Sequence, residues 1–386
     1  MISSSVMIRR FCCFSSASSP STTIAAKSIP EKNRLVFLGS PQVCVSVLDA
    51  LLDAAAAPDS SFEVSAIVTQ PPSGRDRGRK VMPSPVARHA LERGYASDLI
   101  FTPVKAGEEP FLSKLKALKP QLCVTAAYGN ILPSKFLNIP SKGTVNVHPS
   151  LLPLYRGAAP VQRALQDGVK ETGVSLAYTV RQLDAGPVIA YEKLEIDDKI
   201  KAPELLELLF ALGSELLIRE LPSILDGSAR VKAQEQDDSI ATLAPKICPD
   251  ESWLSFDEEA STIHHKVRAF SGWPGTRARL AVFDSRSNQS SIIELKIITT
   301  RVYSGRITQD GETDELFFSN GSLIVPCGGS TSLEVLEVQL PGKKVVNAAA
   351  FWNGLRGQTL KKMLTEKLMN TSRCTIMADS HAQVLT

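Results

Sequence analysis

An asparagine and a histidine stand two residues apart in the segment GTVNVHPS, as Asn146 and His148. The valines around them indicate a short apolar strand, in which alternate side chains leave the same face. An amide and an imidazole placed side by side can donate hydrogen bonds to an oxygen that becomes negative in a transition state. The imidazole can also exchange a proton near neutral pH. The two residues are therefore candidates for a catalytic site.

The chain after His148 is stiffened by Pro149, Pro153 and Pro160, with Gly157 among them. A rigid loop of this kind can present backbone groups to a ligand. A single histidine at a strand end is more often a half-buried structural residue. Here the neighbouring amide and the rigid loop favour the catalytic interpretation.

A second group of residues is cationic. Within residues 74–80 the chain carries Arg75, Arg77, Arg79 and Lys80, with glycines among them. Such a loop can follow a phosphate backbone. Most charge runs are solvated surface loops, so the residues alone leave both interpretations open.

The length and composition of the chain limit the classes of protein to which it can belong. At 386 residues the chain exceeds a usual single core, so two domains are expected. The net charge of +3 does not argue for nucleic acid unless basic residues are concentrated locally. The seven cysteines form no CxxC pair, and the five histidines are not at metal-ligand spacing from them, which argues against a disulfide scaffold and a metal site. No apolar stretch reaches the length of a membrane span.

The first thirty residues differ from the rest. They contain Arg9, Arg10 and Lys27, many serines, and no acid before Glu31. This composition is typical of an organellar transit peptide, and the alternative is a merely disordered N-terminus. The early paired arginines favour the mitochondrion, with the plastid as a further destination.

Strands and helices alternate in the first half, which must position the candidate residues. Strands are predicted at residues 34–39, 62–68, 122–127, 143–147, 174–178 and 188–194, and helices at 42–56, 85–93, 112–119, 160–167 and 205–224. This order predicts an α/β domain with an open, mainly parallel, Rossmann-like sheet covered by helices on both faces. Ligands of such sheets bind at the carboxyl ends of strands.

The second half changes character after a polar, irregular segment. Short alternating runs at residues 278–283, 292–299, 305–308, 315–318, 322–327 and 333–340 predict a small C-terminal β-barrel with OB-like topology. We therefore expect a transit peptide (1–30), a catalytic domain (34–227), a linker (228–250), a barrel (251–368) and a loose tail (369–386).

The segment from Gly143 to Pro160 resembles the signature of the folate-dependent formyltransferase family. Its extension YRGAAPVQRA, residues 155–164, resembles the members of that family that act on methionyl-tRNA. Further similar segments follow the same order along both halves: residues 70–71, 82–85, 127–129, 131–133, 171–174, 268–270, 273–274 and 340–344. A collinear set of this length is far more specific than one motif.

The resemblance implies an activity and a catalytic trio. The activity is transfer of the formyl group of 10-formyltetrahydrofolate to the amino group of initiator methionyl-tRNA, for organellar translation initiation. The family's trio of an asparagine, a histidine two residues later and a downstream aspartate corresponds to Asn146, His148 and Asp184. The alternative role of Asp184 is to start a hairpin turn. Val180 and Gln182 depart from the family's usual acid and glycine, which leaves the shape of this loop open.

The same resemblance implies how the substrates are held. The reduced folate is expected on Ser150, Leu151, Leu152 and Pro153, and the cationic loop is expected to enter the acceptor stem of the tRNA. No metal, no membrane and no second copy of the chain are expected to take part. Seven cations of the second domain are candidates for further phosphate contacts: Lys266, Arg268, Arg277, Arg279, Lys343, Lys344 and Arg356.

A mechanism follows from this chemistry. The methionyl amine attacks the formyl carbon and gives a tetrahedral intermediate with an oxyanion. Asn146 would hydrogen-bond the oxyanion, His148 would stabilise it or protonate the departing folate nitrogen, and Asp184 would orient His148 and help to remove the amine proton.

Three rival functions remain at this point. A formyltransferase acting on glycinamide ribonucleotide or on a nucleotide sugar would use the same trio, but would not need the cationic loop or the barrel. A formyl-folate hydrolase or a folate-binding regulator would use water or nothing as acceptor. A general RNA-binding module would leave the trio without a role.

Overall fold

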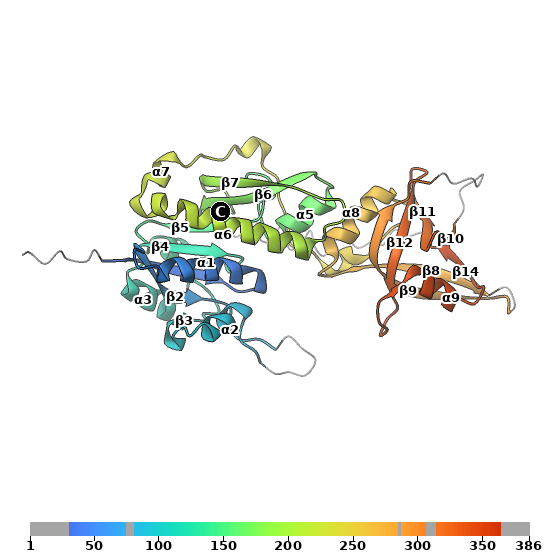
Figure 1. Ribbon diagram of the computed structural model, residues 1–386, viewed down its shortest axis with the longest axis horizontal. Helices are drawn as coiled ribbons and strands as arrows, with labels where there is room; N and C mark the ends of the chain where they lie inside the picture. Colours follow the sequence, from blue (N-terminus) through green and yellow to red (C-terminus); the bar gives the residue numbers. More distant parts are fainter. Residues whose placement is uncertain (1–30, 75–80, 285–286, 306–313, 364–386) are drawn as a thin grey trace, which may run out of the picture. The chain divides into compact units, whose positions relative to one another are not determined.

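The protein is described by a computed structural model that covers residues 31–74, 81–284, 287–305 and 314–363 (Figure 1). The proposed transit peptide, the cationic residues Arg75, Arg77, Arg79 and Lys80, nearly all of the strand expected at 305–308, and the tail at 369–386 lie outside these residues.

A seven-stranded sheet forms the first domain. Its spatial order is β3 (Ile100–Phe101), β2 (Phe62–Val68), β1 (Asn33–Gly39), β4 (Leu122–Ala126), β5 (Thr144–His148), β6 (Glu171–Tyr178) and β7 (Val188–Glu195). The first five strands are parallel, and β6 and β7 add an antiparallel hairpin beside β5. The prediction of a mainly parallel, Rossmann-like sheet is confirmed.

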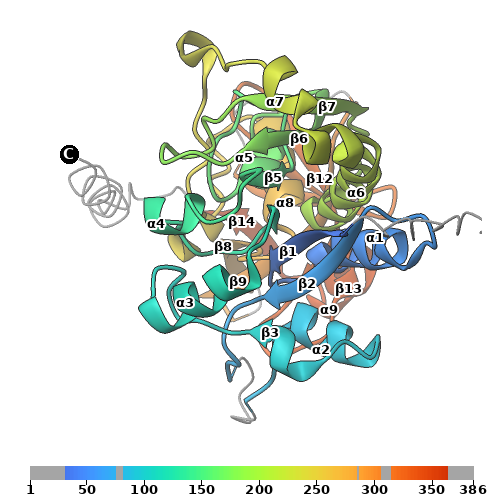
Figure 2. The same cartoon turned by 90° about the vertical axis from the view of Figure 1, so that its left-hand side faces the viewer.

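Helices cover both faces of this sheet. They are α1 (Val45–Ala56), α2 (Pro85–Glu92), α3 (Glu109–Leu118), α4 (Ser134–Leu137), α5 (Pro160–Gln166) and α6 (Ala202–Asp226), with short 3-10 turns at Gln42–Cys44 and Ser97–Leu99. Figure 2 shows α1 and α6 on one side of the strands and α3 and α4 on the other. The central strands are buried on both faces, which explains their nearly continuous apolar sequences.

The strand that bears the candidate residues packs closely against α6. Val145 and Val147 belong to the core on the α6 side of the sheet. A Cβ atom built on Gly213 of α6 would lie 2.6 Å from a methyl group of Val147, so only glycine allows this approach. Because side chains alternate along a strand, Asn146 and His148 point to the opposite face.

Residues 228–250, for which the sequence predicts a polar, irregular linker, combine short regular elements with irregular chain. They begin with a short helix, α7 (Ser228–Lys232), and then return over the first domain. Gln234 forms an antiparallel bridge with Val188, and Leu243 forms a parallel bridge with Arg156. These pairings give backbone groups of β7 and of the loop after β5 hydrogen-bond partners.

The second domain is a closed antiparallel barrel. Its strands are β8 (Thr276–Asp284), β9 (Gln289–Val302), β12 (Ser332–Gln339), β11 (Ser322–Pro326), β10 (Glu315–Ser319) and β14 (Thr359–Lys362), and β14 pairs back onto β8. A short strand, β13 (Val346–Asn347), pairs antiparallel with the end of β12. The predicted β-barrel is confirmed. The sequence missed β14 and two helices, α8 (Ala260–Phe270) and α9 (Ala348–Gly354), together with two 3-10 turns at Asp238–Ile240 and Pro249–Ser252.

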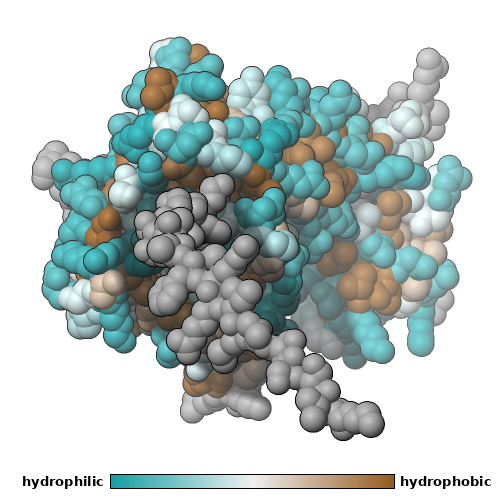
Figure 3. All heavy atoms as spheres, turned by 60° about the vertical axis from the view of Figure 1, so that its left-hand side comes forward, coloured by the Kyte–Doolittle hydropathy of each residue, from teal (hydrophilic) through white to brown (hydrophobic). Residues whose placement is uncertain are grey.

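On the face drawn in Figure 3, hydrophilic side chains predominate and hydrophobic ones form separate groups among them. Among the helices of the described residues, none has both the length and the apolar character required to span a membrane.

Candidate active site

Asn146 is held by a threonine on the neighbouring parallel strand. Thr125 of β4 stands beside Asn146 of β5 in the register of the sheet. The Thr125 hydroxyl donates a hydrogen bond of 2.8 Å to the amide oxygen of Asn146. With its oxygen occupied in this way, the amide presents its NH₂ group to a ligand. Asn146 is therefore oriented as a hydrogen-bond donor, as stabilisation of an oxyanion requires.

His148 is the last residue of β5 and only 4% of its surface is exposed. Its Nε2 atom lies 3.1 Å from the main-chain carbonyl oxygen of Tyr155. A carbonyl can only accept, so Nε2 donates in this hydrogen bond. The other ring nitrogen, Nδ1, lies 3.8 Å from Oδ2 of Asp184.

Asp184 reaches His148 from the loop between β6 and β7. Its backbone is left-handed, with φ of 45°, and its Oδ2 atom accepts a hydrogen bond of 2.9 Å from the N–H of Gly157. Gln236 donates to the carbonyl oxygens of Asp184 and Gly186, at 2.8 and 2.7 Å. The aspartate thus has both roles weighed from the sequence, since it shapes the turn and also faces the imidazole.

The structure brings Asn146, His148 and Asp184 together on one face of the sheet, but it changes one expected contact. A separation of 3.8 Å is too long for a hydrogen bond, so Asp184 does not orient the imidazole directly. Oδ2 of Asp184 accepts a hydrogen bond from the N–H of Gly157 instead. The departures at Val180 and Gln182 do not keep Asp184 away from the site.

Residues Ser150–Pro153 fold back onto β6. The Ser150 side chain is fully buried, and its hydroxyl donates a hydrogen bond of 2.7 Å to the carbonyl oxygen of Leu154. Ser175 of β6 donates to the carbonyl oxygen of Ser150 at 2.8 Å and accepts from the N–H of Leu152 at 3.1 Å. The hydroxyl of Ser150 therefore stabilises the loop, and a ligand would meet the half-buried Leu151, Leu152 and Pro153 and their backbone. A folate contact here stays a prediction.

Sequence reasoning missed several supporting residues. Thr125, Gln236 and Thr242 were assigned no role, and Tyr155 was part of a motif without a function of its own. Gln236 also accepts a hydrogen bond of 2.9 Å from Nε of Arg156, so it ties together the loops that carry Tyr155 and Asp184. In the sequence, Gln236 and Thr242 are simply polar residues in a predicted linker. Such residues are common, so their type and position do not indicate a role in the site.

Two of the second-domain cations are structural. Lys266 donates to the carbonyl oxygen of Trp253 at 2.7 Å, and burial lowers its pKa. Arg268 is 4% exposed, burial lowers its pKa, and it donates to the carbonyl oxygens of Asp197 and Ile200 at 2.6 and 3.0 Å. Neither side chain is presented to a phosphate, because each is committed to main-chain carbonyl oxygens.

The other second-domain cations are placed differently. The guanidinium groups of Arg277 and Arg279 lie 5.3 and 4.6 Å from the centre of the Trp253 ring. The remaining three, Lys343, Lys344 and Arg356, are exposed.

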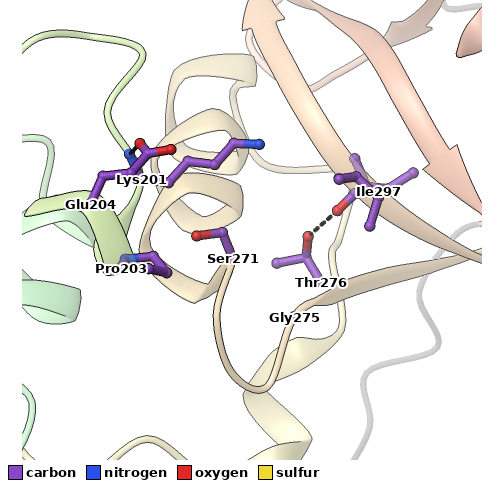
Figure 4. Close-up of a pocket in the computed structure, with 8 residues that line it drawn as sticks. Lys201, Pro203, Glu204, Ser271, Gly275, Thr276 and Ile297 are labelled. Carbon is purple, nitrogen blue, oxygen red and sulfur yellow. Dashed lines mark hydrogen bonds between the residues drawn. The ribbon is translucent and has the colours of Figure 1, made fainter. Parts of the chain in front are cut away.

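Two cavities lie where the start of α6 meets the end of α8. The smaller, of about 200 Å³, is lined by Lys201, Pro203, Glu204 and residues at the start of the barrel (Figure 4). The larger, of about 420 Å³, includes Ala158 and Ala159, which directly follow Gly157. No member of the trio lines either cavity, so the site is defined by its side chains rather than by these cavities.

Comparison with known proteins covers both domains. The family description "Formyl transferase" matches residues 33–221, and "Formyl transferase, C-terminal domain" matches residues 246–356. A methionyl-tRNA formyltransferase of Moorella thermoacetica is 35% identical over 326 residues, which are 83% of this chain and 96% of the relative. One from Methylococcus capsulatus is 36% identical over 323 residues, with the same two coverages of 83% and 96%.

A solved structure extends the comparison in fold. A sugar 3-N-formyl transferase, crystallised in the presence of dTDP and 5-N-formyl-THF, is 16% identical with a TM-score of 0.56 and covers 81% of this chain and 100% of its own. At this identity the likeness concerns the fold alone. The bacterial relatives go further, because they match the sheet domain and the barrel together at 35–36% identity. The chain is therefore a formyl-transferring enzyme and belongs to the methionyl-tRNA formyltransferase family.

Proposed function

We propose that the chain transfers the formyl group of 10-formyltetrahydrofolate to the free amino group of initiator methionyl-tRNA. The observation that carries this proposal is the convergence of an amide donor, an imidazole nitrogen and a carboxylate, from Asn146, His148 and Asp184, in a chain whose relatives bear that name. The folate donor is supported by the formyl-folate present with the structural neighbour.

The geometry suits attack by an amine. Nδ1 of His148 and Oδ2 of Asp184 are 3.8 Å apart, and both can accept a hydrogen bond when the ring is neutral. A donor group fits between two such acceptors, and the amino group of the acceptor substrate is that donor. When the amine attacks the formyl carbon, its nitrogen becomes positively charged and loses a proton to this pair.

The same step creates an oxyanion on the formyl carbon. The NH₂ group of Asn146, whose orientation is set by Thr125, donates to this oxygen. The C–N bond to the folate then breaks, and the leaving nitrogen takes up a proton from the imidazolium. Holding amine and formyl carbon in line contributes up to roughly 7–11 kcal/mol toward lowering the barrier.

The decisive experiment offers the purified full chain four acceptors with 10-formyltetrahydrofolate. They are initiator methionyl-tRNA, a matched elongator methionyl-tRNA, an amino nucleotide sugar and glycinamide ribonucleotide. We expect N-formylmethionyl-tRNA from the initiator and little product from the others. Formate released from formyl-folate alone would instead support a hydrolase, and product only from a small acceptor would contradict the proposal.

We further propose that the cationic loop binds the tRNA. Its residues Arg75, Arg77, Arg79 and Lys80 lie outside the described residues, between β2 and α2. Because β2 is one of the parallel strands, this connection leaves the edge of the sheet that holds the carboxyl ends of β1, β4 and β5.

Replacing Arg77, Arg79 and Lys80 by alanine removes three candidate phosphate partners. The salt dependence of tRNA affinity should flatten by up to about three times the slope of a single contact. Folate affinity should not change. Titrations with tRNA at several salt concentrations, and with folate, measure these quantities. If tRNA affinity and its salt dependence were unchanged, the loop would be ordinary solvated surface and the proposal would be wrong.

Finally, we propose that residues 1–30 direct import into mitochondria, with the plastid as a second destination. The support is the basic, serine-rich and acid-free sequence of this segment. Fused to a fluorescent reporter, it should carry the reporter into the organelle, and a wholly cytosolic reporter would refute this. Removing the segment should leave the activity of the purified enzyme intact, because the cores that the structure describes begin after it.

A further inference from the structure

Among the residues that the structure describes, the imidazole of His148 has a hydrogen-bond partner at one ring nitrogen only, and that partner is a backbone carbonyl. Nε2 lies 3.1 Å from the carbonyl oxygen of Tyr155, whereas Nδ1 is 3.8 Å from the nearest carboxylate oxygen, on Asp184. If the aspartate fixed the tautomer, Nδ1–H would donate to it at normal hydrogen-bond length. Instead, the short contact is at Nε2, and Nδ1 lies beyond hydrogen-bond distance of Asp184.

We propose that Tyr155 is a positioning residue whose main-chain carbonyl fixes His148 as the Nε2–H tautomer, so that Nδ1 is the nitrogen that exchanges the substrate's proton. A neutral imidazole has one N–H, and the hydrogen bond made by one nitrogen decides which nitrogen carries it. Because the carbonyl of Tyr155 can only accept, the proton stays on Nε2. The lone pair of Nδ1 then faces the space beside Asp184.

Tyr155 must be held in place to do this, because its φ of 60° is left-handed. A residue with a side chain occupies this conformation only when its surroundings enforce it. The hydroxyl of Tyr155 donates a hydrogen bond of 2.9 Å to Oδ2 of Asp167, which follows α5. Burial and this aspartate raise the pKa of Tyr155, so the phenol keeps the proton that it donates.

The backbone of Tyr155 is fastened by a second, independent contact. Its N–H donates a hydrogen bond of 2.8 Å to the hydroxyl of Thr242, and the next N–H, of Arg156, donates to the Thr242 carbonyl at 2.9 Å. Thr242 belongs to the segment that returns over the first domain after α7. A residue far from His148 in the sequence therefore sets the orientation of the carbonyl that His148 meets.

The tautomer can be read directly by NMR spectroscopy. The full chain, labelled with ¹⁵N in its histidine rings, has five histidines, and a His148→Gln variant identifies the signals of His148. At about pH 8, above the ordinary pKa of histidine, we expect the correlation pattern of a protonated Nε2 and an unprotonated Nδ1. The pattern of a protonated Nδ1 would overturn the proposal.

Variants of Thr242 test the cause. Thr242→Val removes the hydroxyl that holds Tyr155, so both tautomers of His148 should appear and kcat should fall about 10-fold. KM for both substrates should stay the same, because no binding group is removed. Thr242→Ser keeps the hydroxyl and should restore both the spectrum and kcat, which guards against a mere folding defect.

The matched control is Thr300→Val. It removes the threonine hydroxyl that is hydrogen-bonded to Nδ1 of His264, which is also buried. It should change the signals of His264 and leave those of His148 and kcat unchanged. An unaltered His148 spectrum and kcat in Thr242→Val would refute the role of Tyr155. The catalytic consequence rests on the proposed function, but the spectra do not. A chain with the expected tautomer and no formyl transfer would therefore contradict the function and leave this inference standing.

Discussion

His148 in the first domain and His264 in the second are both buried. Each contacts a main-chain carbonyl through Nε2, and the two differ in what surrounds Nδ1. Nε2 of His148 and Nε2 of His264 lie 3.1 and 3.0 Å from main-chain carbonyl oxygens, those of Tyr155 and Asp198. Nδ1 of His264 is 2.9 Å from the hydroxyl of Thr300, whereas Nδ1 of His148 has no partner within hydrogen-bond distance in the part of the chain that the structure describes. The histidine with both nitrogens satisfied is structural, and the one with a nitrogen left over can take part in chemistry.

The surroundings of the two rings agree with this division. His264 lies on α8 beside Arg268, and both bind carbonyl oxygens of the segment Asp197–Ile200 that leads into α6. Burial, and then the positive charges of Arg268 and His265, lower the pKa of His264. The side chain therefore works as a neutral connector. Nδ1 of His148 instead lies 3.8 Å from a carboxylate oxygen of Asp184.

The largest effect is expected from removing the site residues. Asn146→Ala, His148→Ala and Asp184→Asn should each lower turnover by at least about 10²-fold, the usual size for oxyanion and acid–base groups. Folding and tRNA affinity should change little, since the remaining contacts of the loops are intact. Steady-state kinetics, with circular dichroism as the control, would measure this. Near-normal turnover in a folded His148→Ala enzyme would contradict the mechanism.

The corresponding change at the structural histidine should act on stability instead. His264→Ala leaves the Asp198 carbonyl and the Thr300 hydroxyl without their buried partner, which should lower the free energy of unfolding by about 1–3 kcal/mol. Turnover measured below the unfolding range should stay within about threefold of the wild type. A large loss of turnover without a loss of stability would erase the distinction between the two histidines.

The smallest expected effect concerns pH. The pKa values of His264 and His265 are both lowered from 6.5, mainly by burial, so the unfolded chain takes up protons that the folded chain does not. Their contribution to stability is complete above about pH 7 and is lost as the pH falls through 6.5 toward their folded values.

Urea unfolding between about pH 8 and 5.5 isolates this effect, because the carboxylates with lowered pKa values titrate below that window. The loss of stability in acid should be shallower in His264→Ala, where one of the two groups is missing. An equal slope in wild type and variant would show that His264 does not carry the effect.

The strands and the longer helices could be predicted because their signals are local. β2 begins and ends where its apolar run predicts, and α1 and α6 follow the periodicity of their sequences. The helix α8 was missed because much of its stability comes from contacts rather than sequence propensity. Its Ile263 and Val267 are buried in the barrel core, and its His264 and Arg268 bind carbonyls of the first domain.

The sequence by itself determined that Asn146 and His148 share a face, because alternation along a strand depends only on neighbouring residues. The resemblance to known enzymes added Asp184. Only the tertiary structure decided which group orients His148. The answer is the backbone carbonyl of Tyr155, fastened by Thr242, with Asp184 bound to Gly157 instead. Every residue other than proline has the same backbone donor and acceptor, so nothing in a sequence marks the carbonyl that the fold will place against a catalytic ring.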